Sequence, residues 1–261
     1  MNTNEILALY DEQERKNSIH PSFQRETSWG VVRHVNLDPS RRSFIVYSEL
    51  TEANANQVIA EQRNWYKNEV NGAGLEWKIY DHDVPPDLKE RLSAQGFEAE
   101  EVEALLVLDL EQCPPVYLQP VTVDVRRITD PEQLGDVPMI QEAAWGSEFG
   151  WLEKTLQDNL TKQPDFWSIY IAYVDDAPAC AAWISFPPDS QFAGLWGGAT
   201  VPAYRKMGVY TAVVATRVQE AIQRGYRFLT VDASDMSRPI LEKRGFQLLT
   251  YTTPFVWKPE T

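Results

Sequence analysis

The residues best suited to chemistry in this sequence form a short basic loop at 205–208, Arg-Lys-Met-Gly, directly before a predicted helix. Apolar residues recur at helical spacing over 209–222, and Gly225 stands where a helix C-cap is expected. The loop therefore lies at a helix N-terminus, where free N–H groups and the helix dipole attract an anion. Its basic side chains add positive charge, and Gly208 lets the backbone approach a ligand closely. The pattern favours a phosphate-bearing ligand; the alternative is an ordinary solvated helix start.

The segments that follow the helix extend this pattern. β-Rich runs cover 226–232 and 247–257, and 234–244 favours a short helix between them. The string V-P-x-Y-R-x-x-G before the long helix and the string I-L-E-K-R-G-F before the last strand together resemble the GCN5-related N-acetyltransferase (GNAT) family. The resemblance covers residues 121–258.

Two positions depart from the family's motifs. The family's loop reads Q/R-x-x-G-x-G/A, and Arg205 and Gly208 fill it, but Tyr210 stands where Gly or Ala is usual. In the late motif, Leu241 replaces a tyrosine that often protonates the leaving thiolate. The resemblance therefore leaves two routes open: water protonates the thiolate, or the thiolate leaves unprotonated.

The resemblance implies a binding site for acetyl-CoA, the acyl donor, between two diverging strands. The strand before the loop would pair with the pantetheine arm like an added strand, and the amides of 207–211 would contact the pyrophosphate. Gly197 and Gly198 allow either a bulge near the acyl group or a turn. Ser234 stands where the family often has an asparagine near the cofactor. The cofactor-binding residues implied are Ala199, Thr200, Val201, Arg205, Lys206, Met207, Gly208, Val209, Tyr210, Thr211 and Ser234.

Acetyl transfer to an amine requires a deprotonated amine, a polarised thioester carbonyl and a leaving thiolate. All three histidines of the chain precede residue 83, so carboxylates, hydroxyls or water must serve in the second half. Asp232, at a predicted strand end, is a candidate base or water-positioning group, or else a cap of the next turn. Glu148 lies in the helical region that shapes the acceptor pocket in the family, and its alternative is an exposed carboxylate early in a helix.

Three prolines within 112–120 mark a boundary, so the predicted organisation is a domain at 1–112, an extended linker at 113–120 and a domain at 121–261. The element order of the last part matches the GNAT fold: a mixed α/β (α+β) class with a twisted mixed sheet flanked by helices. The first part repeats a strand–helix rhythm without the basic loop. We interpret it as a shortened, degenerate GNAT-like copy in a tandem arrangement; the alternative is an unrelated α+β domain.

Composition narrows the partners and the compartment. The net charge of −14 argues against a general nucleic-acid or acidic-membrane binder, and most of the acidic excess precedes residue 116. No apolar run reaches the ~18 residues of a membrane helix, and the N-terminus lacks a signal-peptide pattern. Cys113 and Cys180 have no metal-site spacing, so we expect no metal and a cytoplasmic location.

These observations predict an acetyl-CoA-dependent N-acetyltransferase that acts on a small-molecule amine. Two alternatives stay open: an acyl-CoA-binding sensor without turnover, and transfer to a protein N-terminus or lysine. Because the first half has no basic loop at a helix start, we expect it to bind no CoA and to border the acceptor or to cover a sheet edge.

Overall fold

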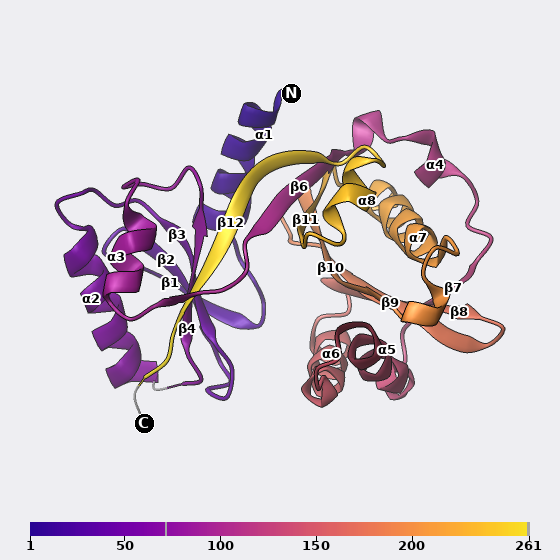
Figure 1. Ribbon diagram of the computed structural model, residues 1–261, viewed down its shortest axis with the longest axis horizontal. Helices are drawn as coiled ribbons and strands as arrows, with labels where there is room; N and C mark the ends of the chain where they lie inside the picture. The colour runs from indigo at the N-terminus through magenta and orange to yellow at the C-terminus, as the bar shows by residue number, and fades with distance from the viewer. Residues whose placement is uncertain (71, 260–261) are drawn as a thin grey trace. The chain divides into compact units, whose positions relative to one another are not determined.

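The computed structural model describes residues 1–70 and 72–259 (Figure 1). The chain divides into two compact units. Unit 1 comprises Met1–Leu106, Asp232–Lys243 and Gln247–Thr261, and unit 2 comprises Val107–Val231 and Arg244–Phe246. Each unit has a sheet with both parallel and antiparallel pairs and helices that pack on it, as the mixed α/β class predicts.

Unit 2 contains an antiparallel meander that ends in one parallel pair. Its strands, in spatial order, are β11 (Phe228–Ala233), β10 (Phe192–Thr200), β9 (Ala177–Ser185), β8 (Trp167–Val174) and β7 (Asp124–Ile128). The last two residues of β11 group with unit 1. Asp175 and Asp176, with φ of 50° and 60°, form the left-handed turn that joins β8 to β9. β10 and β11 run parallel because the long helix α7 (Val209–Gln223) connects them as a crossover.

Helices cover both faces of this sheet. α7 lies on one face, and α5 (Asp136–Trp145) and α6 (Gly150–Lys162) lie on the other (Figure 1). Alternation along β8 explains the two cores, because Ile169 and Ile171 join the cluster under α5 and α6 while Tyr170 faces the other way and bonds Glu220 of α7. The shorter helices of this unit are η3 (Leu110–Gln112), α4 (Pro115–Leu118), η4 (Pro131–Gly135) and η5 (Pro202–Tyr204).

The strands of unit 1 also form parallel and antiparallel pairs. Its strands, in spatial order, are β1 (Phe23–Ser28), β2 (Val31–Asn36), β3 (Ser43–Ser48), β4 (Leu75–Tyr80) and β12 (Gln247–Trp257), with β5 (Glu98–Ala99) paired to β12. Its helices are α1 (Thr3–Tyr10), η1 (Asp11–Lys16), α2 (Ala55–Trp65), η2 (Tyr66–Val70), α3 (Leu88–Ala94) and α8 (Arg238–Glu242). The strand β6 (Glu103–Asp109) begins in unit 1 and ends in unit 2.

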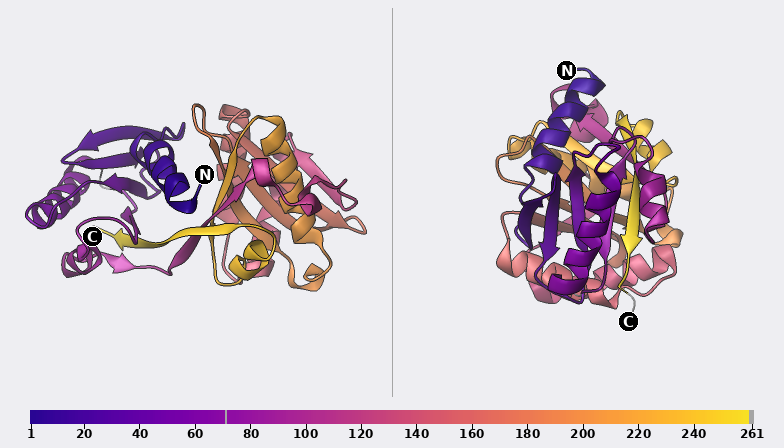
Figure 2. Two further views of the ribbon diagram at one scale, coloured as in Figure 1. Left: turned by 90° about the horizontal axis from the view of Figure 1, so that it is seen from above. Right: turned by 90° about the vertical axis from the view of Figure 1, so that its left-hand side faces the viewer.

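The core of unit 1 lies under α2 and α3, which stand in front of the strands in the right-hand view of Figure 2. Trp77 and Ile79 of β4 point into this core together with Val58 and Ile59 of α2. Tyr80, next along β4, points to the opposite face, where the guanidinium of Arg15 from η1 lies 3.7 Å from the centre of its ring. The N-terminal helices therefore cover the second face.

The two units share one supersecondary pattern. In unit 2, β10 and β11 pair at three positions and are joined through α7; in unit 1, β3 and β4 pair at three positions and are joined through α2. A parallel pair of this kind requires a helical crossover, so the repetition supports the interpretation of the first half as a shortened copy of the second.

Three features differ from the expected organisation. The segment 113–120 is not an extended linker throughout, because α4 lies within it and buries Tyr117, whose carbonyl accepts a hydrogen bond from Gln219 of α7. β12 groups with unit 1 rather than with the half that precedes it, because it pairs with β4. The third feature is the N-terminal segment, where α1, η1 and the β1–β2 hairpin form without having been predicted. The domain boundaries themselves stay a prediction.

We expect unit 1 to lose stability as the pH falls from about 6.5 toward 4. Burial, with a contribution from His34, lowers the pKa of His20 to about 4, against ~6.5 in an unfolded chain. The unfolded state therefore binds the proton more readily, and the stability that neutral His20 contributes is present above ~6.5 and lost below it. Urea unfolding at pH 7, 6, 5 and 4 measures the slope, and His20→Gln should flatten it. Equal slopes for the two proteins would rule His20 out as the cause.

Candidate active site

A gap opens between β10 and β11 in unit 2. The strands pair at Phe192↔Phe228, Ala193↔Leu229 and Gly194↔Thr230, and no further pair follows within the described residues, although β10 runs on to Thr200. This stretch of β10 therefore has no strand paired on its β11 side, and an extended ligand can add there by main-chain hydrogen bonds to the backbone groups that no side chain bonds. Ala199 and Thr200, two of the predicted cofactor-binding residues, lie on this stretch.

β10 also contains a bulge at the place where glycine allowed one. The register with β9 passes from Trp196↔Trp183 to Ala199↔Ala181, so that β10 advances three residues while β9 advances two. Gly197 takes φ +59°, and a Cβ there would clash with the ring of Trp183. A Cβ on Gly198 would lie 3.0 Å from the ring of Tyr210. The two glycines thus form a bulge and not a turn.

Alanine at Gly197 is expected to destabilise the protein more than alanine at Gly208. Both residues have positive φ, so both substitutions carry left-handed strain of about 1–2 kcal/mol. Only Gly197 also meets a side chain, and displacing the Trp183 ring adds about 1–3 kcal/mol. Urea unfolding of the two variants gives the comparison. A difference below about 0.5 kcal/mol would mean that the ring moves aside freely.

Two buried side chains hold the bulge from opposite faces of the sheet. Gln141 of α5 donates from Nε2 to the carbonyl of Gly197 at 2.6 Å, and its Oε1 accepts from Trp145 Nε1 at 3.1 Å. Arg217 of α7 donates from Nη1 to the carbonyls of Trp183 at 3.1 Å and Trp196 at 3.4 Å. Neither residue was predicted. Sequence offered one signal, since Arg217 interrupts the apolar stripe of its helix.

The basic loop adopts the geometry expected of an anion site. Gly208 is the N-cap of α7 with φ +83°, and it makes no side-chain cap. The first intrahelical bond runs from the N–H of Ala212 to Gly208, so the amides of Val209, Tyr210 and Thr211 have no intrahelical acceptor. Three N–H groups at the positive end of the helix dipole are thus available to a phosphate.

The two basic side chains of this loop have different surroundings. Arg205 donates from Nε to the carbonyl of Thr200 at 3.2 Å and from Nη2 to that of Ala144 at 3.2 Å. It therefore ties the end of β10 to the C-terminus of α5. Lys206 and Met207 are exposed, and Lys206 takes φ +65°. Lys206 is thus an exposed cation beside the amides of α7, while Arg205 fixes the loop.

Tyr210 fills the position where the family has Gly or Ala. Its ring packs on the backbone of Gly198, so the bulky side chain is accommodated by the bulge. Burial raises the pKa of its phenol, and the nearby Arg217 opposes that rise. Thr200 donates to Cys180 Sγ at 3.3 Å beneath the same strand. Val201, the remaining predicted contact from this strand, packs against the core under α5 and α6.

The predicted catalytic carboxylates lie in unlike surroundings. Asp232 Oδ2 forms an ion pair with Lys78 Nζ at 2.6 Å, and Lys78 also contacts Glu103 at 3.3 Å. Burial alone would lower the pKa of Lys78, but Asp232 raises it, which keeps the ammonium charged. The carboxylate of Asp232 is thus engaged by Lys78. Glu148 is exposed in the segment between α5 and α6, just before the helix in which it was expected.

The structure therefore brings together part of the predicted set. Residues 199–201 and 205–211 belong to unit 2, whereas Asp232 and Ser234 group with unit 1. Ser234 Oγ lies 3.3 Å from Ser237 Oγ at the start of α8, a contact typical of a turn. Leu241, in place of the family's tyrosine, is buried in the core. The assignments of Asp232, Glu148 and Ser234 stay predictions.

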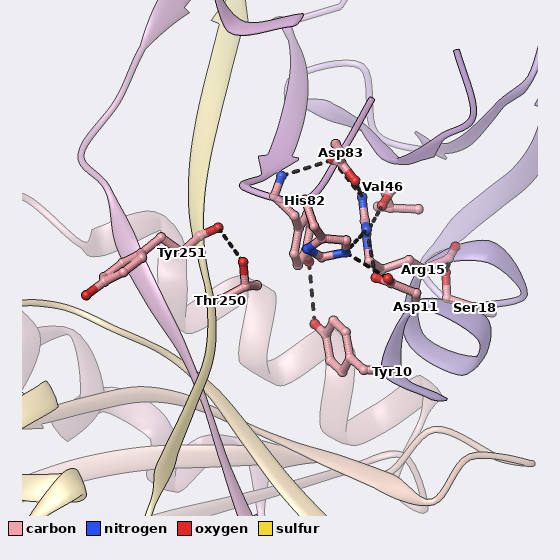
Figure 3. A network of polar contacts seen from close by, with 10 residues as sticks. Tyr10, Asp11, Arg15, Ser18, Val46, His82, Asp83, Thr250 and Tyr251 are labelled. Atoms are coloured by element: carbon pink, nitrogen blue, oxygen red, sulfur yellow. Dashed lines mark hydrogen bonds and ion pairs between the residues drawn. The ribbon is translucent and has the colours of Figure 1, made fainter. Parts of the chain in front are cut away.

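The corresponding gap in unit 1 is filled by the chain itself (Figure 3). β3 and β4 pair last at Ile45↔Trp77, and Arg15 lies where they part. Its Nε donates to the carbonyl of Val46 at 3.1 Å, and its Nη2 lies 2.7 and 2.8 Å from the carboxylate oxygens of Asp83. That carboxylate accepts the N–H of Tyr80 at 2.9 Å. Arg15 thus bridges the two strands where an extended ligand would otherwise pair.

Comparisons with known proteins agree with this geometry. Residues 133–246 match the family model described as the Acetyltransferase (GNAT) family. This chain carries a GNAT-family domain. Family and fold together indicate an acyltransferase. Comparison with curated proteins finds no match.

Solved structures that resemble the whole chain include GNAT proteins. A GCN5-related N-acetyltransferase from Kribbella flavida aligns with a TM-score of 0.71 at 14% identity, over 99% of this chain and 96% of that one. A tandem GNAT protein from the clavulanic acid biosynthesis pathway aligns with a TM-score of 0.60 at 13% identity, over 100% and 89%. A functionally unknown conserved protein from Staphylococcus epidermidis aligns with a TM-score of 0.67 at 13% identity, over 93% and 96%. At these identities the likeness shows the fold, and the GNAT domain rests on the family match.

Proposed function

We propose that the GNAT domain transfers an acetyl group from acetyl-CoA to the amine of a small molecule. One observation carries the proposal. In unit 2, β10 has a bulge and a stretch without a partner strand on its β11 side, and it is followed along the chain by the uncapped amides at the start of α7. The pantetheine arm would pair with Ala199–Val201, and the pyrophosphate would accept from the amides of residues 207–211. Lys206 would add charge beside the phosphates.

The proposed reaction is a direct acyl transfer. The amine nitrogen attacks the thioester carbonyl carbon, the C–N bond forms, the C–S bond breaks, and CoA leaves as a thiolate. The proton lost by the amine passes to a carboxylate or to water, and the thiolate takes up a proton from water. The chain holds no histidine after residue 82, so Asp232 or Glu148, acting directly or through water, are the bases we propose.

A cationic amine is the acceptor that the charge of the chain favours. A net charge of −14 raises the local concentration of cations, and it disfavours nucleic acid and anionic membranes as partners. Within the described residues, no helix is long and apolar enough to cross a membrane, and no group of three His, Cys, Asp or Glu side chains could hold a metal. We propose the cytoplasm as the site of action.

We also propose that unit 1 is a degenerate GNAT-like copy that binds no CoA. Two observations support this: its parallel strand pair repeats that of unit 2, and Arg15 fills the gap between the strands. The 261-residue chain should therefore bind one CoA per chain in calorimetry. Two equivalents per chain would contradict the proposal for unit 1 alone.

A sensor without turnover is the second candidate. The buried Leu241 supplies no hydroxyl for the leaving thiolate, and Asp232 is engaged by Lys78. Both observations favour binding over chemistry.

One pair of measurements separates the candidates. Calorimetry with acetyl-CoA measures binding, and release of free thiol across panels of small amines and peptides measures turnover. Turnover with small amines supports the enzyme, turnover with peptides alone favours a protein acetyltransferase, and binding without thiol release favours the sensor. Absence of binding and of a thermal shift at millimolar acetyl-CoA would reject every candidate, since a native-state ligand must stabilise the fold.

A further inference from the structure

The bulge of β10 is held at two consecutive carbonyls by side chains from opposite faces of the sheet. Arg217 of α7 donates to the carbonyl of Trp196, and Gln141 of α5 donates to the carbonyl of Gly197. Figure 1 shows α7 and α5 on the two sides of this sheet. Both side chains are buried, at 1% and 3% exposure, so neither contact is a chance arrangement of surface groups.

Burying the charged side chain of Arg217 lowers the stability of the fold more than burying an apolar side chain would. Its guanidinium bonds three backbone carbonyls and, among the described residues, no carboxylate. Its neighbours Tyr210, Cys180, Tyr170 and Tyr117 are phenols and a thiol whose pKa values burial raises, so they are neutral near pH 7. Burying a cation without a counter-charge carries a large desolvation free energy. An apolar side chain would fill the same space without that penalty.

The bulge places two N–H groups outside the paired register of β10. Gly197 and Gly198 have no register partner on β9, and this stretch of β10 lies beyond its last pair with β11. Their N–H groups belong to the peptides whose carbonyls Arg217 and Gln141 bond, namely 196–197 and 197–198. A peptide whose carbonyl accepts a strong hydrogen bond is polarised, and its N–H becomes a better donor.

We propose that Arg217 and Gln141 are positioning residues that fix and polarise the β10 bulge, so that an amide of the bulge stabilises negative charge on the thioester carbonyl of the acyl donor. The inference rests on the proposed function. Neither side chain touches the donor; both act through the peptide. The buried charge of Arg217 adds a fixed positive field beside the bulge, and preorganised groups of this kind can stabilise developing charge.

The carbonyl stretch of bound acetyl-CoA tests this directly. Infrared difference spectra with acetyl-CoA labelled at the carbonyl carbon should show a lower frequency on the full-length protein than in water. Gln141→Leu and Arg217→Met should each return the band toward its position in water, because the amides lose polarisation. Arg217→Lys should recover part of the shift. Arg224→Met, which removes an arginine of the same helix that pairs with Glu220, is the matched control and should leave the band unchanged.

Kinetics add a second readout. Removing one donor of this kind lowers kcat by about 10²–10³, and weakening it through Gln141→Leu should cost about tenfold or more. The KM for acetyl-CoA should stay within about threefold, because the pyrophosphate and the arm bind elsewhere. If Arg217→Met does not fold, Gln141→Leu and Arg217→Lys still test the positioning role of the two side chains.

Results against this inference can be told apart from results against the proposed function. An unshifted band in the unaltered protein that binds acetyl-CoA, or a variant that binds it with the band of the unaltered protein, would overturn the inference and leave the proposed function standing. Failure of the unaltered protein to bind acetyl-CoA would reject the proposed function and this inference with it.

Discussion

An aspartate at position 208 is expected to weaken CoA binding by about a hundredfold and to leave the fold intact. Gly208 has φ +83°, and a Cβ there would meet open space, so the side chain itself is accommodated. Asp and Asn are among the residues that best tolerate left-handed backbone. The new carboxylate would stand beside the proposed pyrophosphate. At an effective dielectric of ~20, like charges ~5 Å apart repel by roughly 3 kcal/mol, which is about a hundredfold in the dissociation constant.

Gly208→Asn is the matched control, because it has the same size and backbone tolerance without the charge. Calorimetry of both variants with CoA gives the dissociation constants, and thermal unfolding checks that both fold. The asparagine variant should bind several times more weakly than the unaltered protein at most. Equal affinities for the aspartate and asparagine variants would place the phosphates away from this loop.

Removing Arg15 is expected to cost about 3–5 kcal/mol of unfolding free energy. Its guanidinium is buried and forms a two-pronged ion pair with the buried Asp83, so Arg15→Met leaves a carboxylate without its counter-charge. The variant also loses the contact with the ring of Tyr80 and the hydrogen bond to the carbonyl of Val46. Urea unfolding of the full-length protein measures the loss.

A double-mutant cycle separates the ion pair from packing. Asp83→Asn alone should also destabilise, and Arg15→Met with Asp83→Asn should cost less than the sum of the single changes, because the two residues interact. Additive losses would show that packing of Arg15, and not its charge, closes the gap of unit 1. Calorimetry of Arg15→Met with CoA tests in addition whether unit 1 binds CoA once the gap between β3 and β4 is open. Binding there would appear as a second equivalent of CoA per chain.

Local signals in the sequence predicted much of unit 2. The helical spacing over 209–222 and the β-rich run after it gave α7 and β11, because hydrophobic period is set by neighbours within a few residues. Gly208 and the glycine pair at 197–198 carried the backbone freedom that the N-cap and the bulge require. The uncapped amides follow from the same local pattern.

What sequence did not show depends on partners far along the chain. Arg15 and Asp83 are separated by 68 positions, and no local rule pairs them. Asp232 was predicted from its place at a strand end, but that place says nothing of Lys78, which binds it. Arg217 was not predicted, because the carbonyls of Trp183 and Trp196 that it bonds lie on β9 and β10, far from it along the chain. The β1–β2 hairpin escaped notice because Trp29, at φ 55°, occupies a turn position where Asn or Gly is typical.

The pairing of β12 with β4 has a consequence for folding during synthesis on the ribosome. Thr252 lies opposite Tyr80 and Trp257 opposite Leu75, so β4 pairs with a strand that is synthesised about 170 residues after it. Until residues 247–257 emerge, β4 presents an unpaired edge that is prone to aberrant pairing. Closing such a long loop also slows folding. Unit 1 should therefore mature last although it is translated first, and chaperone demand should centre on nascent chains that still lack this strand.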